Sequence, residues 1–336
     1  MTRRGEPVPT NETLAAYSNY LIYGAMAAFT IAMIAFAASL ASMRGRDLVP
    51  AGVPEAEAAS GGVAVATRTA LAVGGPDDGA LPPGRRSGNI GMSVTWLGTV
   101  LLGAGVLLRG LSVQRPPWGN MYEFAVTTAF AVALAFVALS LKRDLRWLGL
   151  FVVLPVLLTL GLAVTVLYTD AAQLVPALKS YWLVIHVTAA IICGGAFCIG
   201  AAVTLLFLVA DSGERRALVG KRYRLDALAR RLPEAARLDA MAYRIHAFMF
   251  PLWTFAVVAG AIWAENAWGR YWGWDPKETW AFITWVVYAA YLHARATAGW
   301  KGRKASVVAL VAFGCFLFNF FGVNILITGL HSYAGV

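Results

Sequence analysis

The chain has 336 residues, of which 59% are hydrophobic and 14% charged, and its mean hydropathy is +0.64. These values exclude an ordinary soluble domain and indicate a polytopic membrane protein. The net charge of +10 does not predict nucleic-acid binding, because no basic patch lies on a soluble module. Each cysteine falls in an apolar run and none forms a CxxC pair, so neither a thiol relay nor a disulfide scaffold is indicated.

Apolar runs along the chain predict an all-α fold, a polytopic membrane helix bundle of about eight transmembrane helices without a soluble domain. Residues 1–110 form an N-terminal two-span region that includes a disordered cytoplasmic linker at 44–91, which lacks helical or strand periodicity. Residues 111–336 form a six-span core. The predicted spans are residues 17–40, 92–108, 124–141, 148–168, 181–210, 245–263, 279–294 and 306–329.

The distribution of positive charge predicts the orientation of this bundle. If the loops alternate between two sides, the side with both termini carries seven Lys and Arg, and the other side carries the remaining 21 of 28. The positive-inside rule then places the N- and C-termini outside the cytoplasm. The predicted location is the cytoplasmic (plasma) membrane, multi-pass, with residues 263–280 on the extracytoplasmic side.

The stretch Trp263–Trp280, WAENAWGRYWGWDPKETW, contains five of the twelve tryptophans. Interleaved glycines let rings and backbone approach closely, which is typical of a platform for a large flat apolar ligand. An aromatic re-entrant loop at the headgroups is the alternative, and composition leaves both open. Within the stretch, Asp275-Pro276-Lys277-Glu278 predicts a helix start with a capping box, a structural role for Asp275 and Glu278.

The predicted topology sorts the four histidines into two pairs. His186 and His331 lie at the outer face beside the tryptophans, which favours two axial nitrogens for haem iron, although either one alone is more typical of an interfacial polar residue. His293 lies about 26 Å beyond Pro276 at the helical rise, near the cytoplasmic side. His246 also lies on that side. These two could hold a second haem, or His246 could be merely interfacial.

The segment WGRYWGWDPKETW resembles the WWD signature of the haem-handling cytochrome c assembly proteins, most closely the CcsA/ResC subunits of the system II cytochrome c synthase. Order and spacing of further segments fit the same family from residue 118 to 336, whereas residues 1–110 carry little resemblance. These segments are PWGNMYEF (117–124), LVPALKSYWLVIHV (174–187), WVVYAAYLHAR (285–295) and FGVNILITGLHSY (321–333).

The resemblance implies a set of residues that bind haem b. His186 and His331 would be the outer iron ligands, His293 the intramembrane ligand, and the haem-holding loop would comprise Trp268, Trp272, Trp274 and Asp275. His246 matches no family histidine, and the second intramembrane ligand is expected from a partner subunit.

The resemblance also implies cytochrome c maturation. Haem would cross the bundle and be joined to a CxxCH apocytochrome c by thioether bonds, with a ResB/CcsB-type membrane partner, so the chain would be one subunit of a cytochrome c synthase (haem lyase). No acid–base or nucleophile constellation surrounds the tryptophans, so no catalytic residue is predicted and positioning is the expected contribution.

Two other classes of protein would use the same features. A two-haem b-type electron-transfer subunit would also need four histidines, although such bundles usually pair them inside the membrane. A transporter for an apolar solute would leave the histidines structural.

Overall fold

The computed structural model describes residues 10–45, 83–174, 178–221 and 223–331, and its regular elements there are helices. Asn11, Asn120, Ser180 and Asp275 cap four of them with side-chain hydrogen bonds. The elements are α1 (Glu12–Ser42), α2 (Arg85–Val113), α3 (Met121–Ser140), η1 (Arg146–Leu148), α4 (Gly149–Thr165), α5 (Tyr181–Leu218), α6 (Asp226–Ala229), α7 (Ala235–Trp268), α8 (Pro276–Ala296), α9 (Arg303–Leu317), the π-helical η3 (Phe318–Gly322) and α10 (Val323–Leu326).

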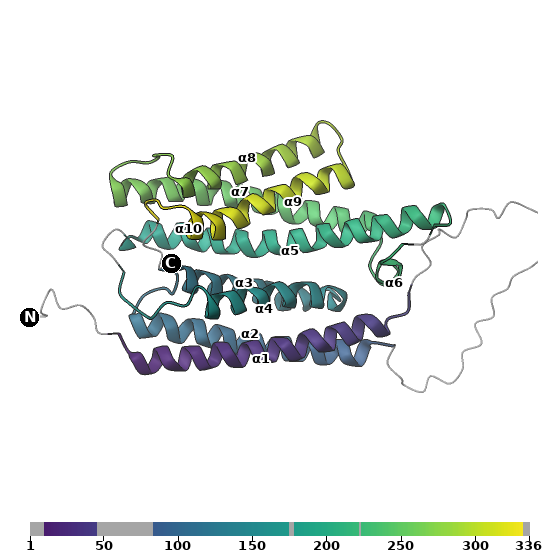
Figure 1. Cartoon of the computed structure of the whole chain (residues 1–336), viewed down its shortest axis with the longest axis horizontal. Coiled ribbons are helices and arrows are strands. Elements are labelled where there is room, and N and C mark those ends of the chain that lie inside the picture. The colour runs from purple at the N-terminus through teal and green to yellow at the C-terminus, as the bar shows by residue number, and fades with distance from the viewer. Residues whose placement is uncertain (1–9, 46–82, 175–177, 222, 332–336) are drawn as a thin grey trace, which may run out of the picture.

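Seven helical segments of the described chain are long and apolar enough to cross a membrane. The eighth expected span is α8, which has 21 residues and runs alongside the others in Figure 1 but is not among the seven. Its tryptophans, tyrosines and His293 lower its hydropathy without shortening it. The all-helical membrane bundle is therefore confirmed, with seven spans by composition and α8 as an eighth helix of spanning length.

The helices pack mainly in pairs, α1 on α2, α3 on α4, α5 on α7 and α8 on α9 (Figure 1). Small residues set the closest contact, between α1 and α2. A Cβ at Gly91, Gly98 or Gly105 would come within about 3 Å of a large side chain on α1, Phe36, Phe29 or Ile22 respectively. This seven-residue glycine repeat lets two membrane helices approach without a hydrophobic driving force.

Helices α5 and α7 are longer than the predicted spans. Their 38 and 34 residues correspond to about 57 and 51 Å at the helical rise, well beyond the roughly 30 Å hydrocarbon core. Most of residues 211–244, which lie between the fifth and sixth predicted spans, are thus helical. The apolar runs predicted helices that were too short, because the last turns of α5 and the first turns of α7 are polar.

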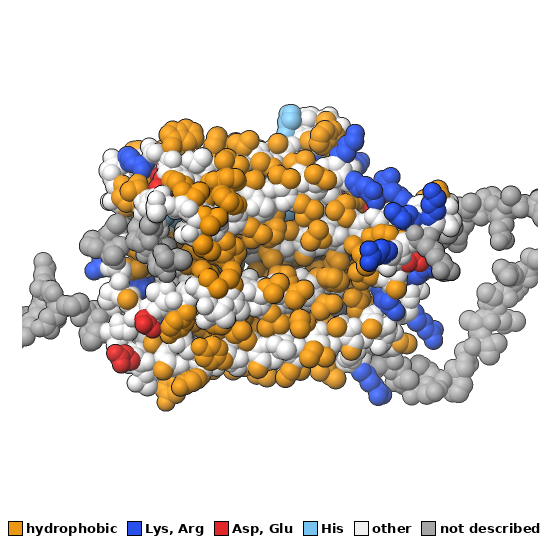
Figure 2. Space-filling model, in the orientation of Figure 1, with side chains coloured by type: hydrophobic (Ala, Val, Ile, Leu, Met, Phe, Trp, Pro, Cys, Tyr) orange, Lys and Arg blue, Asp and Glu red, His pale blue; other side chains and the backbone are white. Residues whose placement is uncertain are grey.

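The start of α2 corrects the predicted linker as well. The helix begins at Arg85, so residues 85–91 are helical, whereas residues 46–82 lie outside the described part of the chain. Figure 2 shows Lys and Arg side chains gathered at the end of the bundle that holds the α5–α7 connection and the α8–α9 turn. This charge separation matches the uneven split predicted from sequence.

Candidate functional site

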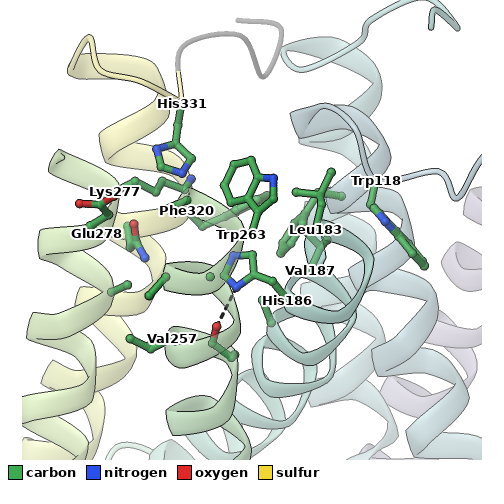
Figure 3. A pocket seen from close by; sticks show the side chains of 18 of the residues that line it. Trp118, Leu183, His186, Val187, Val257, Trp263, Lys277, Glu278, Phe320 and His331 are labelled. Carbon is green, nitrogen blue, oxygen red and sulfur yellow. Dashed lines mark hydrogen bonds between the residues drawn. The ribbon is translucent and has the colours of Figure 1, made fainter. Parts of the chain in front are cut away.

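A large, mostly apolar cavity lies at the opposite end of the bundle from the basic side chains. It encloses about 1190 Å³ of empty space, its open mouth included. Helices α5, α7, α8 and η3 contribute to its wall, together with the loop before α3 and the segment after α10 (Figure 3). Its ring-bearing and charged lining residues are Trp118, Phe124, His186, Trp253, Trp263, Trp268, Tyr271, Trp272, Lys277, Glu278, Phe316, Phe320 and His331.

A capping box fixes the loop that connects α7 to α8. The carboxylate of Asp275 accepts from the Lys277 amide at 3.2 Å, and Glu278 accepts in return from the Asp275 amide at 3.1 Å. Glu278 also accepts a hydrogen bond of 2.8 Å from the amide of Gly273, a loop residue before the helix start. The predicted helix start is confirmed, and it holds the tryptophan loop against the first turn of α8.

Asp275 also binds the segment after α10. Its Oδ1 accepts from the Leu330 amide at 2.7 Å, and its Oδ2 lies 2.8 Å from Nδ1 of His331. Because a carboxylate only accepts, Nδ1 of His331 carries the proton, and the lone pair is on Nε2. Asp275 therefore orients an imidazole at the cavity in addition to capping α8.

Burial and hydrogen bonding oppose each other in this pair. Burial alone would raise the pKa of Asp275, but hydrogen bonds from His331, the Leu330 amide and the Lys277 amide lower it to about 2. Burial lowers the pKa of His331, and the Asp275 contact offsets this only in part. The pair is thus an ionised carboxylate beside a neutral imidazole at neutral pH, the form that can bind a metal.

His186 is held by the neighbouring helix α7. Its Nδ1 lies 2.8 Å from the carbonyl oxygen of Ala256, which can only accept, so the lone pair is again on Nε2. Gly260 makes this contact possible, because a Cβ there would lie 2.8 Å from the imidazole. The ring stacks on Trp263 with an interplanar angle of 11° and a centroid distance of 6.2 Å.

Tryptophans connect the two histidines across the cavity. Trp263 lies next to the labelled rings of both His186 and His331 in Figure 3, and it meets His331 edge-on at a centroid distance of 5.8 Å. The ring centroid of Trp268 lies 4.9 Å from that of Trp263 and 5.1 Å from that of His331. Two oriented imidazoles on an aromatic wall suit a flat apolar ligand with a metal centre.

The structure separates the predicted site residues into those at the cavity and those away from it. His186, His331, Trp268 and Trp272 line it, and Asp275 touches it through His331. Trp274 does not line it: its side chain is 65% exposed, its backbone is left-handed with φ 56°, and its ring contacts Trp272 and Phe282. The predicted membership of Trp274 in the haem-holding loop stays a prediction, and its ring adjoins the cavity only through Trp272.

The inner histidines do not form a pair. His246 is fully buried, packs against Phe197 and two tyrosines of α8, Tyr288 and Tyr291, and has no hydrogen-bond partner on either ring nitrogen within the described residues. His293 is exposed on α8. Because Tyr288 and Tyr291 mark the inner face of α8, His293 points away from His246. A haem held by both side chains is not supported.

Several cavity residues were not in the site predicted from sequence, among them Trp118, Trp263 and Phe320. Trp118 stands in PWGNMYEF, a segment noted only for resemblance, and Trp263 was assigned to the stretch but not to the site. Phe320 comes from a π-helical turn that hydropathy cannot distinguish from ordinary helix. Its ring is tilted by 33° against that of Phe124 at a centroid distance of 4.7 Å, and its centroid lies 5.7 Å from the Lys277 ammonium.

The fold and the cavity define a multi-pass helical membrane protein with a histidine- and tryptophan-lined site at one end. Comparison with known proteins specifies the family: residues 118–331 match the Cytochrome C assembly protein family. CcsA of Guillardia theta is 36% identical over 247 residues, covering 70% of this chain and 81% of its own. CcsA of Synechococcus elongatus is 36% identical over 288 residues, which cover 73% of this chain and 86% of the relative.

The chain therefore belongs to the cytochrome c assembly proteins, and within them to the CcsA cytochrome c biogenesis proteins. Its fold is also that of the cytochrome c haem lyase CcmF, with a TM-score of 0.59 at 13% identity. That alignment covers 99% of this chain and 50% of CcmF, so this chain corresponds to about half of the larger protein.

Proposed function

We propose that this cytochrome c biogenesis protein holds haem b in the outer cavity and presents it for attachment to apocytochrome c. The observation that carries the proposal is the matched pair of imidazoles, each with Nδ1 engaged by a fixed acceptor, Ala256 O for His186 and Asp275 for His331. Both leave Nε2 as the ligating nitrogen on a wall of tryptophans.

Positioning is the chain's expected contribution to the chemistry. Each cysteine thiol of a CxxCH substrate adds across a haem vinyl group, which makes one C–S bond and transfers the thiol proton to carbon. Two axial histidines would hold the iron until the histidine of the substrate replaces one of them. Lys277, whose ammonium lies beside Phe320 at the cavity, offers a cation for a haem propionate.

A second haem would be held on the outside of the bundle. The exposed position of His293 on α8 suits a ligand shared with another membrane subunit, and the proposed partner is a ResB/CcsB-type protein. The packing of His246 disfavours the alternative of a b-type electron-transfer subunit, which would need an in-chain pair inside the membrane. Haem would cross the membrane outward to the cavity, with both termini and the tryptophan loop on the extracytoplasmic side of the plasma membrane.

Ligand replacement tests the outer site directly. We expect His186→Gly and His331→Gly each to abolish maturation of a reporter c-type cytochrome in cells, and imidazole in the medium to restore part of it by filling the vacated ligand position. Phe248→Gly is the matched control, because Phe248 is 77% exposed on α7 and is not part of the cavity lining. Normal maturation in both histidine variants would refute the haem-ligand assignment.

A further inference from the structure

A second apolar cavity lies beside the first and deeper in the membrane. Its empty space, open mouth included, is about 510 Å³ and lies between α3, α4, α5 and the α9–η3 segment. Gly194 and Cys198 on its α5 wall come 8 and 12 residues after His186, which corresponds to about 12 and 18 Å along the helix. This crevice is therefore level with the hydrocarbon interior, whereas the outer cavity is at the rim.

The two cavities share part of their lining, and the shared residues are all phenylalanines. Phe124, Phe316 and Phe320 line both of them. Gly194 makes room for this wall, because a Cβ there would lie 2.8 Å from Cζ of Phe316. A wall made of side chains can open by ring rotation without breaking a helix, which a backbone wall cannot do.

The side of the crevice formed by η3 and α4 departs from regular α-helix at two places. Phe320 and Phe321 belong to the π-helical turn η3, and π-turns recur at functional sites. Pro155 lies inside α4, where it cannot donate a backbone hydrogen bond, and it lines the crevice with Thr159. Leu158, next to Thr159, is exposed on the outer surface. The crevice thus lies between two locally weakened helical segments, and Leu317 in its lining is 37% exposed at the surface.

We propose that haem enters the outer cavity sideways from the bilayer, through the crevice between α4 and η3 and past the wall of Phe124, Phe316 and Phe320. The inference rests on the proposed haem-holding function and adds the route. An apolar, partly aromatic crevice that is continuous with the two ligating histidines suits a flat apolar macrocycle. A lipid tail would fill the same space but would gain nothing from the adjoining imidazoles.

The rate of haem uptake tests the route. Haem-free full-length protein is reconstituted with its partner subunit in phospholipid vesicles, haem is dissolved in the bilayer, and the low-spin absorption band is followed in time. We expect Thr159→Trp, which fills the crevice, to slow uptake on the order of tenfold. Phe321→Ala, which widens it, should accelerate uptake. Leu158→Trp adds the same bulk outside and should match the wild type.

The final spectrum separates the route from the site. All of these variants should reach the wild-type spectrum, because His186 and His331 are untouched. Equal uptake rates in Thr159→Trp, Phe321→Ala and the wild type would overturn the route, and labelling of the crevice by a photoactivatable acyl chain under those conditions would assign it to lipid. If Thr159→Trp fails to fold, an unchanged rate in Phe321→Ala overturns the route by itself. Absence of any low-spin band in the wild type would refute the haem-holding function instead.

Discussion

Oδ2 of Asp275 lies 2.8 Å from Nδ1 of His331, a contact that joins the first turn of α8 to the segment after α10, 56 residues later. The same carboxylate caps α8. One side chain thus couples the shape of the tryptophan loop to the orientation of a predicted iron ligand.

The two roles of Asp275 can be separated by substitution. Serine caps helices well but is too short to reach His331, whereas asparagine retains an acceptor without the charge. We expect the free energy of unfolding of both variants to lie within about 1 kcal/mol of that of the wild type. Haem retention in the purified protein, measured by pyridine haemochrome, should fall in the order wild type, Asp275→Asn, Asp275→Ser. Equal retention in all three would limit Asp275 to capping.

Acid should release the outer ligand, and the sign follows from the two pKa shifts. The pKa of folded His331 lies below the usual 6.5, so the unfolded chain takes up a proton first as the pH falls. Its stabilising contribution is complete above pH 6.5 and is lost as the pH falls through the folded pKa. The stabilising contribution of Asp275 is complete above pH 3.8 and is lost as the pH falls through its folded pKa of about 2.

We therefore expect the low-spin haem spectrum to be constant above pH 6.5 and to decay only below it. An absorption titration of the purified protein checks this, with recovery on return to neutral pH as the control for unfolding. Ligand loss that begins well above neutral pH would contradict a neutral, buried His331.

Gly260 should matter for haem binding although it carries no side chain. In Gly260→Ala the new methyl group would lie 2.8 Å from the His186 ring and displace it from the Ala256 carbonyl. Overpacking of this kind costs about 1 to 3 kcal/mol, and we expect haem content to drop severalfold with it. Gly314→Ala is the matched control, because no atom comes within 4 Å of its added methyl group. Equal haem content in the two variants would contradict the proposed placement of His186.

Sequence patterns predicted which end of the bundle carries the site. They predicted less well the direction in which individual side chains of the site point. Loop alternation predicted that His186, His331 and the tryptophan stretch share one end, and all of them contribute to one cavity. The Asp275–Glu278 spacing predicted the cap, because capping depends on local contacts. By contrast, Trp274 and Trp272 differ in exposure through the left-handed backbone at Trp274, which composition does not reveal.

Contacts between distant helices were the other limit. The approach of Phe320 to Phe124 depends on a π-turn and on helix packing, and neither leaves a periodic signal in the sequence. The depth of His246 and His293 could be estimated from helical rise, but the face of the helix on which each lies could not.

Reporter fusions test the predicted orientation. The split of 21 to seven positive side chains between the two sides predicts that alkaline phosphatase fused after Val336 is active, because it would lie outside the cytoplasm. A cytoplasmic reporter such as green fluorescent protein should be active when inserted at 219–225, between α5 and α6. The reverse pattern would place the His186–His331 cavity on the cytoplasmic face and overturn the proposed site of haem attachment.

The two inner histidines should respond oppositely to substitution. His293 is exposed, so His293→Ala should leave the thermal stability of the chain within about 0.5 kcal/mol while lowering the haem content of the complex with its partner. His246 is enclosed by Phe197, Tyr288 and Tyr291 and has no hydrogen-bond partner on its ring within the described residues, so His246→Phe keeps the packing of a ring. We expect the free energy of unfolding of His246→Phe to stay within about 1.5 kcal/mol of the wild type, and we expect the variant to retain haem. Haem analysis and thermal unfolding of the two purified complexes decide the question. Equal and severe haem losses from both variants would indicate an in-chain ligand pair, which would refute the assignment of the second ligand to the partner.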